Sequence, residues 1–123
     1  MNNVKKMLIV DDEETLTYSL YQSFIISQQD YEVVTAASGE EATEKLGETE
    51  FDLVITDIKM PGMDGLELLS LIKSKYPATE VIVMTAYGSL EKKEEALRKG
   101  ARFYIEKPFE IKEMKQLVME ILQ

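Results

Sequence analysis

Short apolar runs recur along the chain and alternate with longer segments of helical spacing. They predict five strands, at residues 7–10, 31–36, 53–56, 81–84 and 103–105. The first, third and fourth runs are continuously apolar and rich in isoleucine and valine, as is typical of parallel strands that are covered on both faces. The second run is more polar, so we place it at an edge of the sheet.

The segments between these runs carry apolar residues three and four positions apart, which predicts amphipathic helices. The pattern is clearest at Leu16, Leu20 and Phe24, at Leu66, Leu69 and Ile72, and at Ile111, Met114, Leu117, Val118 and Ile121. Helix boundaries are also indicated. Ser38 with Glu41 predicts a capping box, Asp64 an N-cap, and Gly100 the end of the fourth helix.

Five β-α units in series predict a doubly wound α/β fold, because right-handed crossovers place helices on both faces of a parallel sheet. The natural strand order is 2-1-3-4-5. Ligands of such sheets bind beyond the carboxyl ends of the strands, where the winding direction reverses. A chain of 123 residues fits one domain, with no repeat, linker or low-complexity tract, so we expect one site.

The chain has no cysteine and no histidine. These absences exclude disulfides, thiolate zinc sites, imidazole general bases and histidine-ligated metals. Any bound metal must therefore accept oxygen ligands, which favours Mg²⁺, Mn²⁺ or Ca²⁺ over zinc or copper.

The formal net charge is −9, which argues against direct binding of nucleic acid, since that binding relies on lysine and arginine. The first apolar run is too short for the core of a signal peptide, and no stretch approaches the length of a membrane span. We therefore expect a cytoplasmic protein without membrane contact.

Five side chains capable of chemistry follow the ends of the predicted strands. They are Asp11 and Asp12, Asp57, Thr85 and Lys107, after the first, third, fourth and fifth strands. Each alone has an ordinary explanation, such as a cap, a turn or a solvated lysine, but together they predict one site. Carboxylates about 4 Å apart repel by roughly 4 kcal/mol at an effective dielectric constant near 20, so the cluster favours a bound cation. Mg²⁺ suits it.

This set of groups is suited to phosphoryl transfer. Asp57 is central and therefore the best nucleophile for in-line attack on phosphorus, which would produce an acyl phosphate. The metal and Lys107 would share the charge of the equatorial oxygens, and Thr85 would donate a hydrogen bond to one of them.

Four segments, in this order and spacing, resemble the receiver domains of bacterial two-component response regulators over essentially the whole chain. They are LIVDDE at 8–13, VITDIKMPGMDG at 54–65, VIVMTAYG at 81–88 and GARFYIEKPF at 100–109. The resemblance implies one receiver domain over residues 1–123, with a flavodoxin-like three-layer sandwich. Receivers that precede transcriptional activators look most similar.

The resemblance also implies a function and its residues. Asp57 would accept a phosphoryl group from a phosphohistidine of a sensor histidine kinase or a histidine phosphotransfer protein. Mg²⁺, or Mn²⁺ in its place, would be held by Asp11, Asp12, Asp57 and the backbone carbonyl of Lys59. Such a domain is a signalling phosphoacceptor that promotes its own phosphorylation and dephosphorylation, rather than an enzyme acting on other substrates.

By the same resemblance, Thr85 and Lys107 would contact the phosphoryl group, and the Lys107–Pro108 peptide bond would be cis. Thr85 would move toward the phosphoryl group while Tyr104 rotates inward. This switch would change the surface of the fourth helix, fifth strand and fifth helix, which controls an output domain or partner and is also a possible homodimer face.

Two features are particular to this sequence. Lys59 and Tyr87 stand two residues beyond Asp57 and Thr85, where the family tunes loss of the phosphoryl group, and we expect their bulk to slow dephosphorylation. Residues 15–29 carry no charge, and family members of this type meet their kinase largely through this first helix. We therefore predict partner docking at its outer side, which would show Tyr18, Tyr21 and Gln22.

Four alternative functions fit the sequence less well. A phosphohydrolase with an aspartyl nucleophile needs an acid two residues later, where this chain has Lys59. A calcium loop around Asp57 and Asp64 needs oxygen ligands at alternate positions, which Met60 and Gly62 do not supply. A nucleotide binder would need a glycine-rich phosphate loop, and the chain has none. A degenerate receiver is disfavoured because all five key residues are present.

Overall fold

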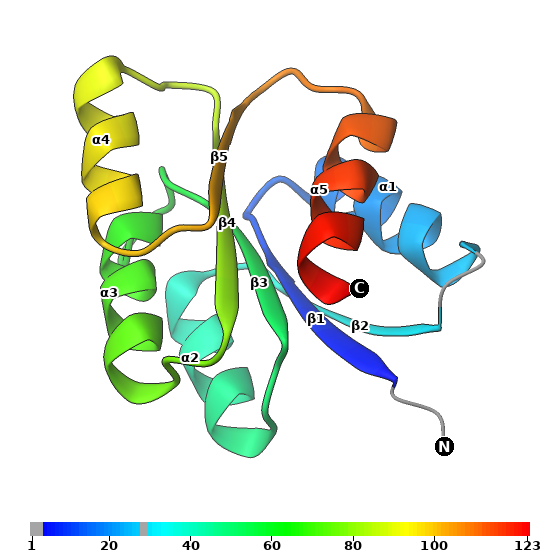
Figure 1. Ribbon diagram of the computed structural model, residues 1–123. Helices are drawn as coiled ribbons and strands as arrows, with labels where there is room; N and C mark the ends of the chain where they lie inside the picture. Colours follow the sequence, from blue (N-terminus) through cyan, green and yellow to red (C-terminus); the bar gives the residue numbers. More distant parts are fainter. Residues whose placement is uncertain (1–3, 28–29) are drawn as a thin grey trace.

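The computed structural model describes residues 4–27 and 30–123. Across these residues strands and helices alternate in the order β1 (Lys5–Val10), α1 (Glu14–Ile25), β2 (Tyr31–Ala36), α2 (Gly39–Glu48), β3 (Leu53–Asp57), α3 (Gly65–Lys75), β4 (Glu80–Thr85), α4 (Leu90–Arg98), β5 (Phe103–Glu106) and α5 (Ile111–Leu122). The strands form one parallel sheet in the order β2-β1-β3-β4-β5. The predicted α/β fold and strand order are confirmed, with β2 at an edge (Figure 1).

The sheet is the middle of three layers, with α1 and α5 on one face and α2, α3 and α4 on the other (Figure 1). Alternate residues of β1 enter the two resulting cores. Met7 and Ile9 pack with residues of α1 and α5, whereas Leu8 and Val10 pack with residues of α2, α3 and α4. This double coverage explains the continuously apolar runs of the central strands. No helix in the described ranges combines the length and apolar character needed to span a membrane.

The predicted helix boundaries are confirmed, but the capping box predicted at Ser38 is only half formed. The Ser38 hydroxyl accepts a 3.0 Å hydrogen bond from the main-chain N–H of Glu41, whereas the Glu41 carboxylate accepts a 2.8 Å bond from the N–H of Ala37 rather than from that of Ser38. Asp64 and Glu67 form a reciprocal capping box, with hydrogen bonds of 2.8 and 3.1 Å, at the start of α3. Gly100, which follows α4, has a φ of 108° and so takes the left-handed conformation that closes many helices. These caps fix where α2 and α3 begin, directly beside the carboxyl ends of the strands.

Candidate functional site

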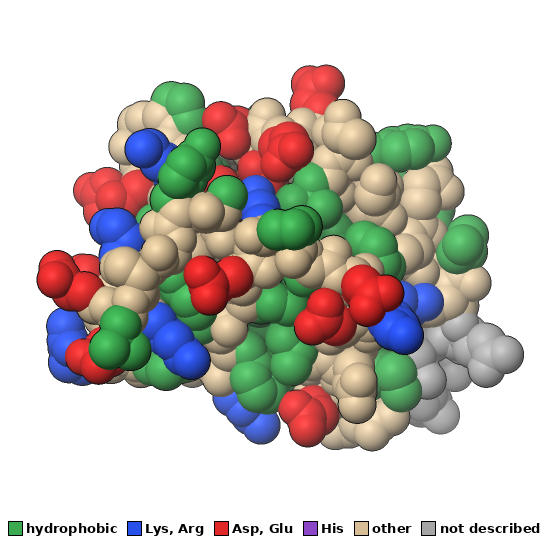
Figure 2. All heavy atoms as spheres, turned by 90° about the horizontal axis from the view of Figure 1, so that it is seen from above, with side chains coloured by type: hydrophobic (Ala, Val, Ile, Leu, Met, Phe, Trp, Pro, Cys, Tyr) green, Lys and Arg blue, Asp and Glu red, His purple; other side chains and the backbone are tan. Residues whose placement is uncertain are grey.

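The carboxyl ends of β1, β3, β4 and β5 meet at one edge of the sheet. Strand register brings Asp57 opposite Met84, and Thr85 opposite Glu106, so the last residues of the three strands lie at a similar level. Figure 2 looks down on this edge and shows acidic side chains spread over the face, with basic side chains between them. A parallel sheet thus assembles the residues that follow its strands into one site.

Three carboxylates converge at this edge. Each of Asp11, Asp12 and Asp57 offers a carboxylate oxygen, and these oxygens lie within 4.8 Å of one another. Asp11 and Asp57 are buried, while Asp12 is exposed. One oxygen of Asp11 accepts a 2.9 Å hydrogen bond from the main-chain N–H of Glu13, which fixes the first turn of the β1–α1 loop around the carboxylate.

Lys107 supplies the positive charge of the cluster. Its Nζ donates to Asp11 Oδ2 at 2.8 Å and lies 3.6 Å from both Asp57 Oδ1 and Glu13 Oε1. Burial alone lowers the pKa of Lys107, but the hydrogen bond to Asp11 and the nearby negative charges outweigh burial and raise it. Lys107 is therefore held as an ammonium, and its bond to Pro108 is cis, as the resemblance implies.

Glu13 was not among the predicted site residues, although it contacts the same ammonium group. The run of four acidic residues at 11–14 could have indicated it, because a strand that ends in such a run directs several carboxylates toward one place.

The Asp57 carboxylate is destabilised in its charged form. Burial, and then repulsion from Asp11, raises its pKa from 3.8 to about 6. Lys107 and the main-chain N–H of Ile58 oppose this rise without cancelling it. A second positive charge at this place would therefore be stabilising.

The donor set fits a hard divalent cation. Three carboxylates and one ammonium leave two negative charges when all four groups are ionised, which a divalent ion would neutralise. All the side-chain donors are oxygens, which Mg²⁺, Mn²⁺ and Ca²⁺ prefer. The cluster could hold a metal ion; the carbonyl of Lys59 as a further ligand stays a prediction.

Thr85 lies at the same edge of the sheet, but its hydroxyl is hydrogen-bonded to the following loop and not to the carboxylates. Its side chain is buried, and its Oγ1 accepts a 3.0 Å hydrogen bond from the main-chain N–H of Tyr87. Within the described part of the chain, no hydrogen bond joins Thr85 to the three carboxylates. The aromatic ring of Tyr87 extends over the adjoining loop, where the Nζ of Lys59 lies 4.9 Å from the ring centroid. This cation–π contact joins the loops after β3 and β4 across the site.

The backbone of Asp57 is fixed by residues that sequence reasoning did not identify. The hydroxyl of Thr56 donates to the Asp57 carbonyl at 2.9 Å, and the N–H of Gly65 donates to the Ile58 carbonyl at 2.8 Å. A Cβ at Gly65 would lie 2.0 Å from the Asp57 carbonyl oxygen, so only glycine permits this approach of α3 to β3. In the sequence, the glycine that directly follows the Asp64 cap could have indicated this close approach of α3 to β3.

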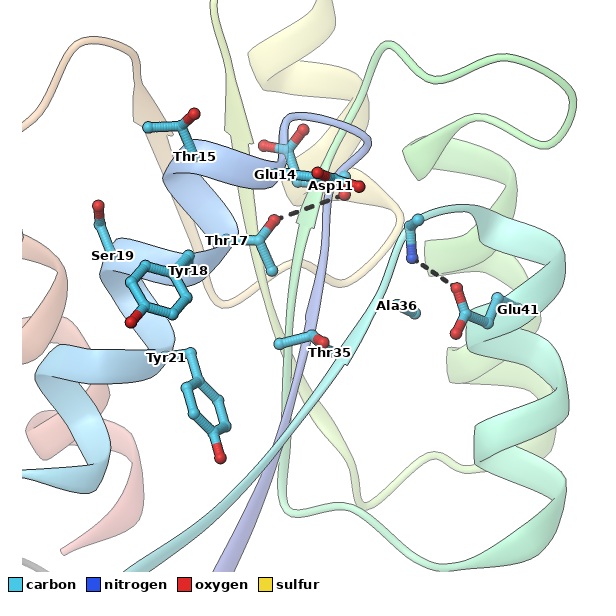
Figure 3. A pocket seen from close by; sticks show the side chains of 11 residues that line it. Asp11, Glu14, Thr15, Thr17, Tyr18, Ser19, Tyr21, Thr35, Ala36 and Glu41 are labelled. Carbon is cyan, nitrogen blue, oxygen red and sulfur yellow. Dashed lines mark hydrogen bonds between the residues drawn. The ribbon is translucent and has the colours of Figure 1, made fainter.

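A groove of about 750 Å³ runs from Asp11 between α1 and β2 (Figure 3). The hydroxyl of Thr17 donates to the main-chain carbonyls of Asp11, at 3.5 Å, and Glu13, at 3.1 Å, which secures the start of α1 beside the carboxylates. Tyr18 and Tyr21 line the groove from α1 (Figure 3). Tyr18 is 64% exposed, whereas Tyr21 is half-buried, so only the first lies on the outer side as predicted.

Comparison with known proteins gives a consistent result. Residues 7–119 match the family model of the response regulator receiver domain. The chain is 42% identical to the response regulator protein FleR of Pseudomonas aeruginosa, over 92% of this chain and 24% of that protein. It is 37% identical to sporulation initiation phosphotransferase F of Bacillus subtilis, over 96% and 94% of the two chains.

The three-dimensional comparison agrees. A CheY-like response regulator receiver domain protein from Methanospirillum hungatei superimposes with a TM-score of 0.88 at 35% identity, covering 96% of this chain and 93% of the other. This chain spans about a quarter of the length of FleR, and nearly all of the length of the Bacillus protein. From the family model, the identity and the fold together, the chain belongs to the response regulator receiver domains, the signalling phosphoacceptors of two-component systems.

Proposed function

We propose that residues 1–123 form a receiver domain in which Asp57 accepts the phosphoryl group of a phosphohistidine. The donor is a sensor histidine kinase or a histidine phosphotransfer protein. An Asp57 carboxylate oxygen attacks phosphorus, the phosphorus–nitrogen bond breaks, and the imidazole takes up a proton. One observation carries the proposal: Asp57 is the carboxylate at the end of the central strand β3, and it lies beside both an acidic pair and the largely buried ammonium of Lys107.

The metal of this site is proposed to be Mg²⁺, with Mn²⁺ able to replace it. Asp11, Asp12, Asp57 and the backbone carbonyl of Lys59 would hold it. When bound, the ion neutralises the carboxylates and the charge on the phosphoryl oxygens.

Lys107 and Thr85 are proposed to bind the phosphoryl oxygens. Lys107 already faces Asp57 at 3.6 Å, and its side chain is only 12% exposed, which limits the screening of its charge by solvent. The Thr85 Oγ1 accepts a hydrogen bond from the N–H of Tyr87, which leaves its O–H able to donate to a phosphoryl oxygen. Because this bond ties Thr85 to the β4–α4 loop, movement of Thr85 toward the phosphoryl group is expected to move that loop as well.

Loss of the phosphoryl group is also proposed to occur within this site, by attack of water on phosphorus. Lys59 and Tyr87 are the second residues of the loops that follow β3 and β4, and their cation–π contact supports a role in restricting water. We expect this pair to lengthen the life of the acyl phosphate.

Partner docking is proposed for α1, which carries no charge after Glu14 and lies beside the site. Residues 15–27 of the uncharged stretch are described, while 28–29 lie outside the described residues. Phosphotransfer to Tyr18→Ala, measured by rapid-quench kinetics with the donor protein, is expected to slow, because Tyr18 is exposed near the site. The exposed Glu44→Ala on α2 serves as the control. Equal rates for the two variants would rule out docking at this tyrosine.

Output is proposed to pass through the α4–β5–α5 surface, with Tyr104 of β5 as a switch residue, to an effector domain, a partner or a second copy of the chain. The net charge of −9 supports a domain that does not itself bind nucleic acid. Residence in the cytoplasm, without membrane contact, accords with two-component signalling and remains part of the proposal.

Intact-protein mass spectrometry tests the proposed chemistry. The wild type, incubated with Mg²⁺ and acetyl phosphate, is expected to gain the mass of one phosphoryl group, and Asp57→Asn is expected to gain none. Asp64→Asn is the matched control, because it changes an aspartate of the next loop and asparagine caps a helix as well as aspartate. Labelling of Asp57→Asn to the wild-type extent would refute the assignment.

A further inference from the structure

Gly88, in the loop between β4 and α4, lies against the end of the Tyr104 side chain. A Cβ at Gly88 would lie 2.4 Å from the Tyr104 hydroxyl oxygen, 3.0 Å from a carboxylate oxygen of Glu106 and 3.3 Å from Cγ2 of Thr85. The backbone of Gly88 is not left-handed, so an alanine is opposed here only by lack of space. The hydroxyl of Tyr104 thus occupies the room that a side chain at position 88 would need.

The inward position of Tyr104 depends mainly on packing. Its half-buried ring packs against the core on the α2, α3 and α4 face, and among the described residues its buried hydroxyl has no well-aligned hydrogen-bond partner. Burial and the nearby Glu106 carboxylate raise the pKa of Tyr104, and the N–H of Ser89 only partly offsets this rise. A buried hydroxyl without a partner disfavours this position relative to one in water. The space beside Gly88 is therefore what makes the inward position available.

We propose that Gly88 is a positioning residue that keeps Tyr104 turned in beneath the β4–α4 loop, and that a side chain at position 88 moves Tyr104 outward onto the β5 surface. The hydroxyl is the free end of a side chain, so it yields more easily than the backbone would. The signalling consequence rests on the proposed function: Thr85 borders the same space, so its movement toward a phosphoryl group would be linked to the position of Tyr104.

Tyrosine nitration tests the inference directly. The folded wild type, Gly88→Ala and Gly47→Ala are treated briefly with tetranitromethane, and nitration of each tyrosine is measured by peptide mass spectrometry. Apart from the backbone of its own helix and its chain neighbours, no atom of the described residues lies within 4 Å of the place that a Cβ at Gly47 would occupy, so Gly47→Ala controls for adding a methyl group. Nitration of Tyr104 is expected to rise several-fold in Gly88→Ala alone, while Tyr18, already exposed, stays constant. Unchanged nitration of Tyr104 in Gly88→Ala would overturn the inference.

A second comparison covers the case in which Gly88→Ala folds poorly. Tyr104→Phe removes the nearest of the three atoms that a methyl group at position 88 would meet. The double variant is therefore expected to recover most of the melting temperature that Gly88→Ala loses. A double variant as unstable as Gly88→Ala would contradict the inference. Neither measurement needs phosphorylation, so a wild type that acetyl phosphate fails to label would count against the proposed function alone.

Discussion

Replacing Asp57 with asparagine is expected to stabilise the metal-free protein at neutral pH. The folded protein raises the pKa of this carboxyl from 3.8 to about 6, so the ionised side chain destabilises the fold. Two pKa units correspond to about 3 kcal/mol, at roughly 1.4 kcal/mol per unit. Because the site opens to water at the sheet edge, we discount this figure and expect a gain of about 1–2 kcal/mol for Asp57→Asn.

The pH dependence follows from the direction of the pKa shift. Below about pH 4 the carboxyl is protonated in folded and unfolded chains alike, and the wild type is not disadvantaged. Between about pH 4 and pH 6 the unfolded chain is ionised while the folded protein still holds the proton, so wild-type stability falls as the pH rises across this window and levels off above it. The advantage of Asp57→Asn should therefore be full at about pH 7.5 and clearly smaller at about pH 5.

Urea unfolding followed by circular dichroism, in the presence of a chelator, measures this difference. Asp64→Asn again serves as the control and should change stability little at either pH. Adding Mg²⁺ should stabilise the wild type by mass action and should stabilise Asp57→Asn much less. An Asp57→Asn variant that is less stable than the wild type at about pH 7.5, or a difference independent of pH, would refute the reasoning.

Three further predictions concern the surroundings of Asp57. Lys107→Met leaves the buried Asp11 carboxylate without its ion pair and should cost about 2–4 kcal/mol of unfolding free energy, measured with urea. Gly65→Ala puts a methyl group against a main-chain carbonyl of β3 and should lower stability by about 3 kcal/mol or prevent folding, as thermal melting would reveal. The double variant Lys59→Asn, Tyr87→Ala should lose its phosphoryl group several-fold faster, followed by loss of radiolabel; an unchanged decay rate would contradict this role.

Most of the fold could be predicted because burial on both faces leaves a continuous apolar signal in the central strands. The predicted strand at 31–36 matches β2, while the others are extended by one or two polar residues. β1 begins at Lys5, before its apolar run, because Lys5 and Lys6 pair with Tyr31 and Glu32 in the ladder. Strand ends are set by main-chain hydrogen bonds, and the pattern of apolar side chains does not show where these bonds stop.

The site was predictable where it depends on strand ends and was not where it depends on loop contacts. Asp57 and Lys107 come together because parallel strands end at one edge. The hydrogen bond from the Tyr87 N–H to the Thr85 hydroxyl depends on the backbone conformation of the turn after β4, which no spacing of residue types indicates. Gly88 matters only through a side chain of another strand, so its importance emerges from coordinates alone.

Strand β3 is hydrogen-bonded on both sides, and every one of its residues, from Leu53 to Asp57, is buried. A group added to Asp57 therefore attaches to the least yielding part of the molecule, where close packing leaves the strand no room to retreat. Whatever volume and charge arrive there must be accommodated by the surrounding loops. Because β3 holds Asp57 rigidly, phosphorylation displaces the surrounding surface loops instead of the strand, and another protein can bind to the changed surface.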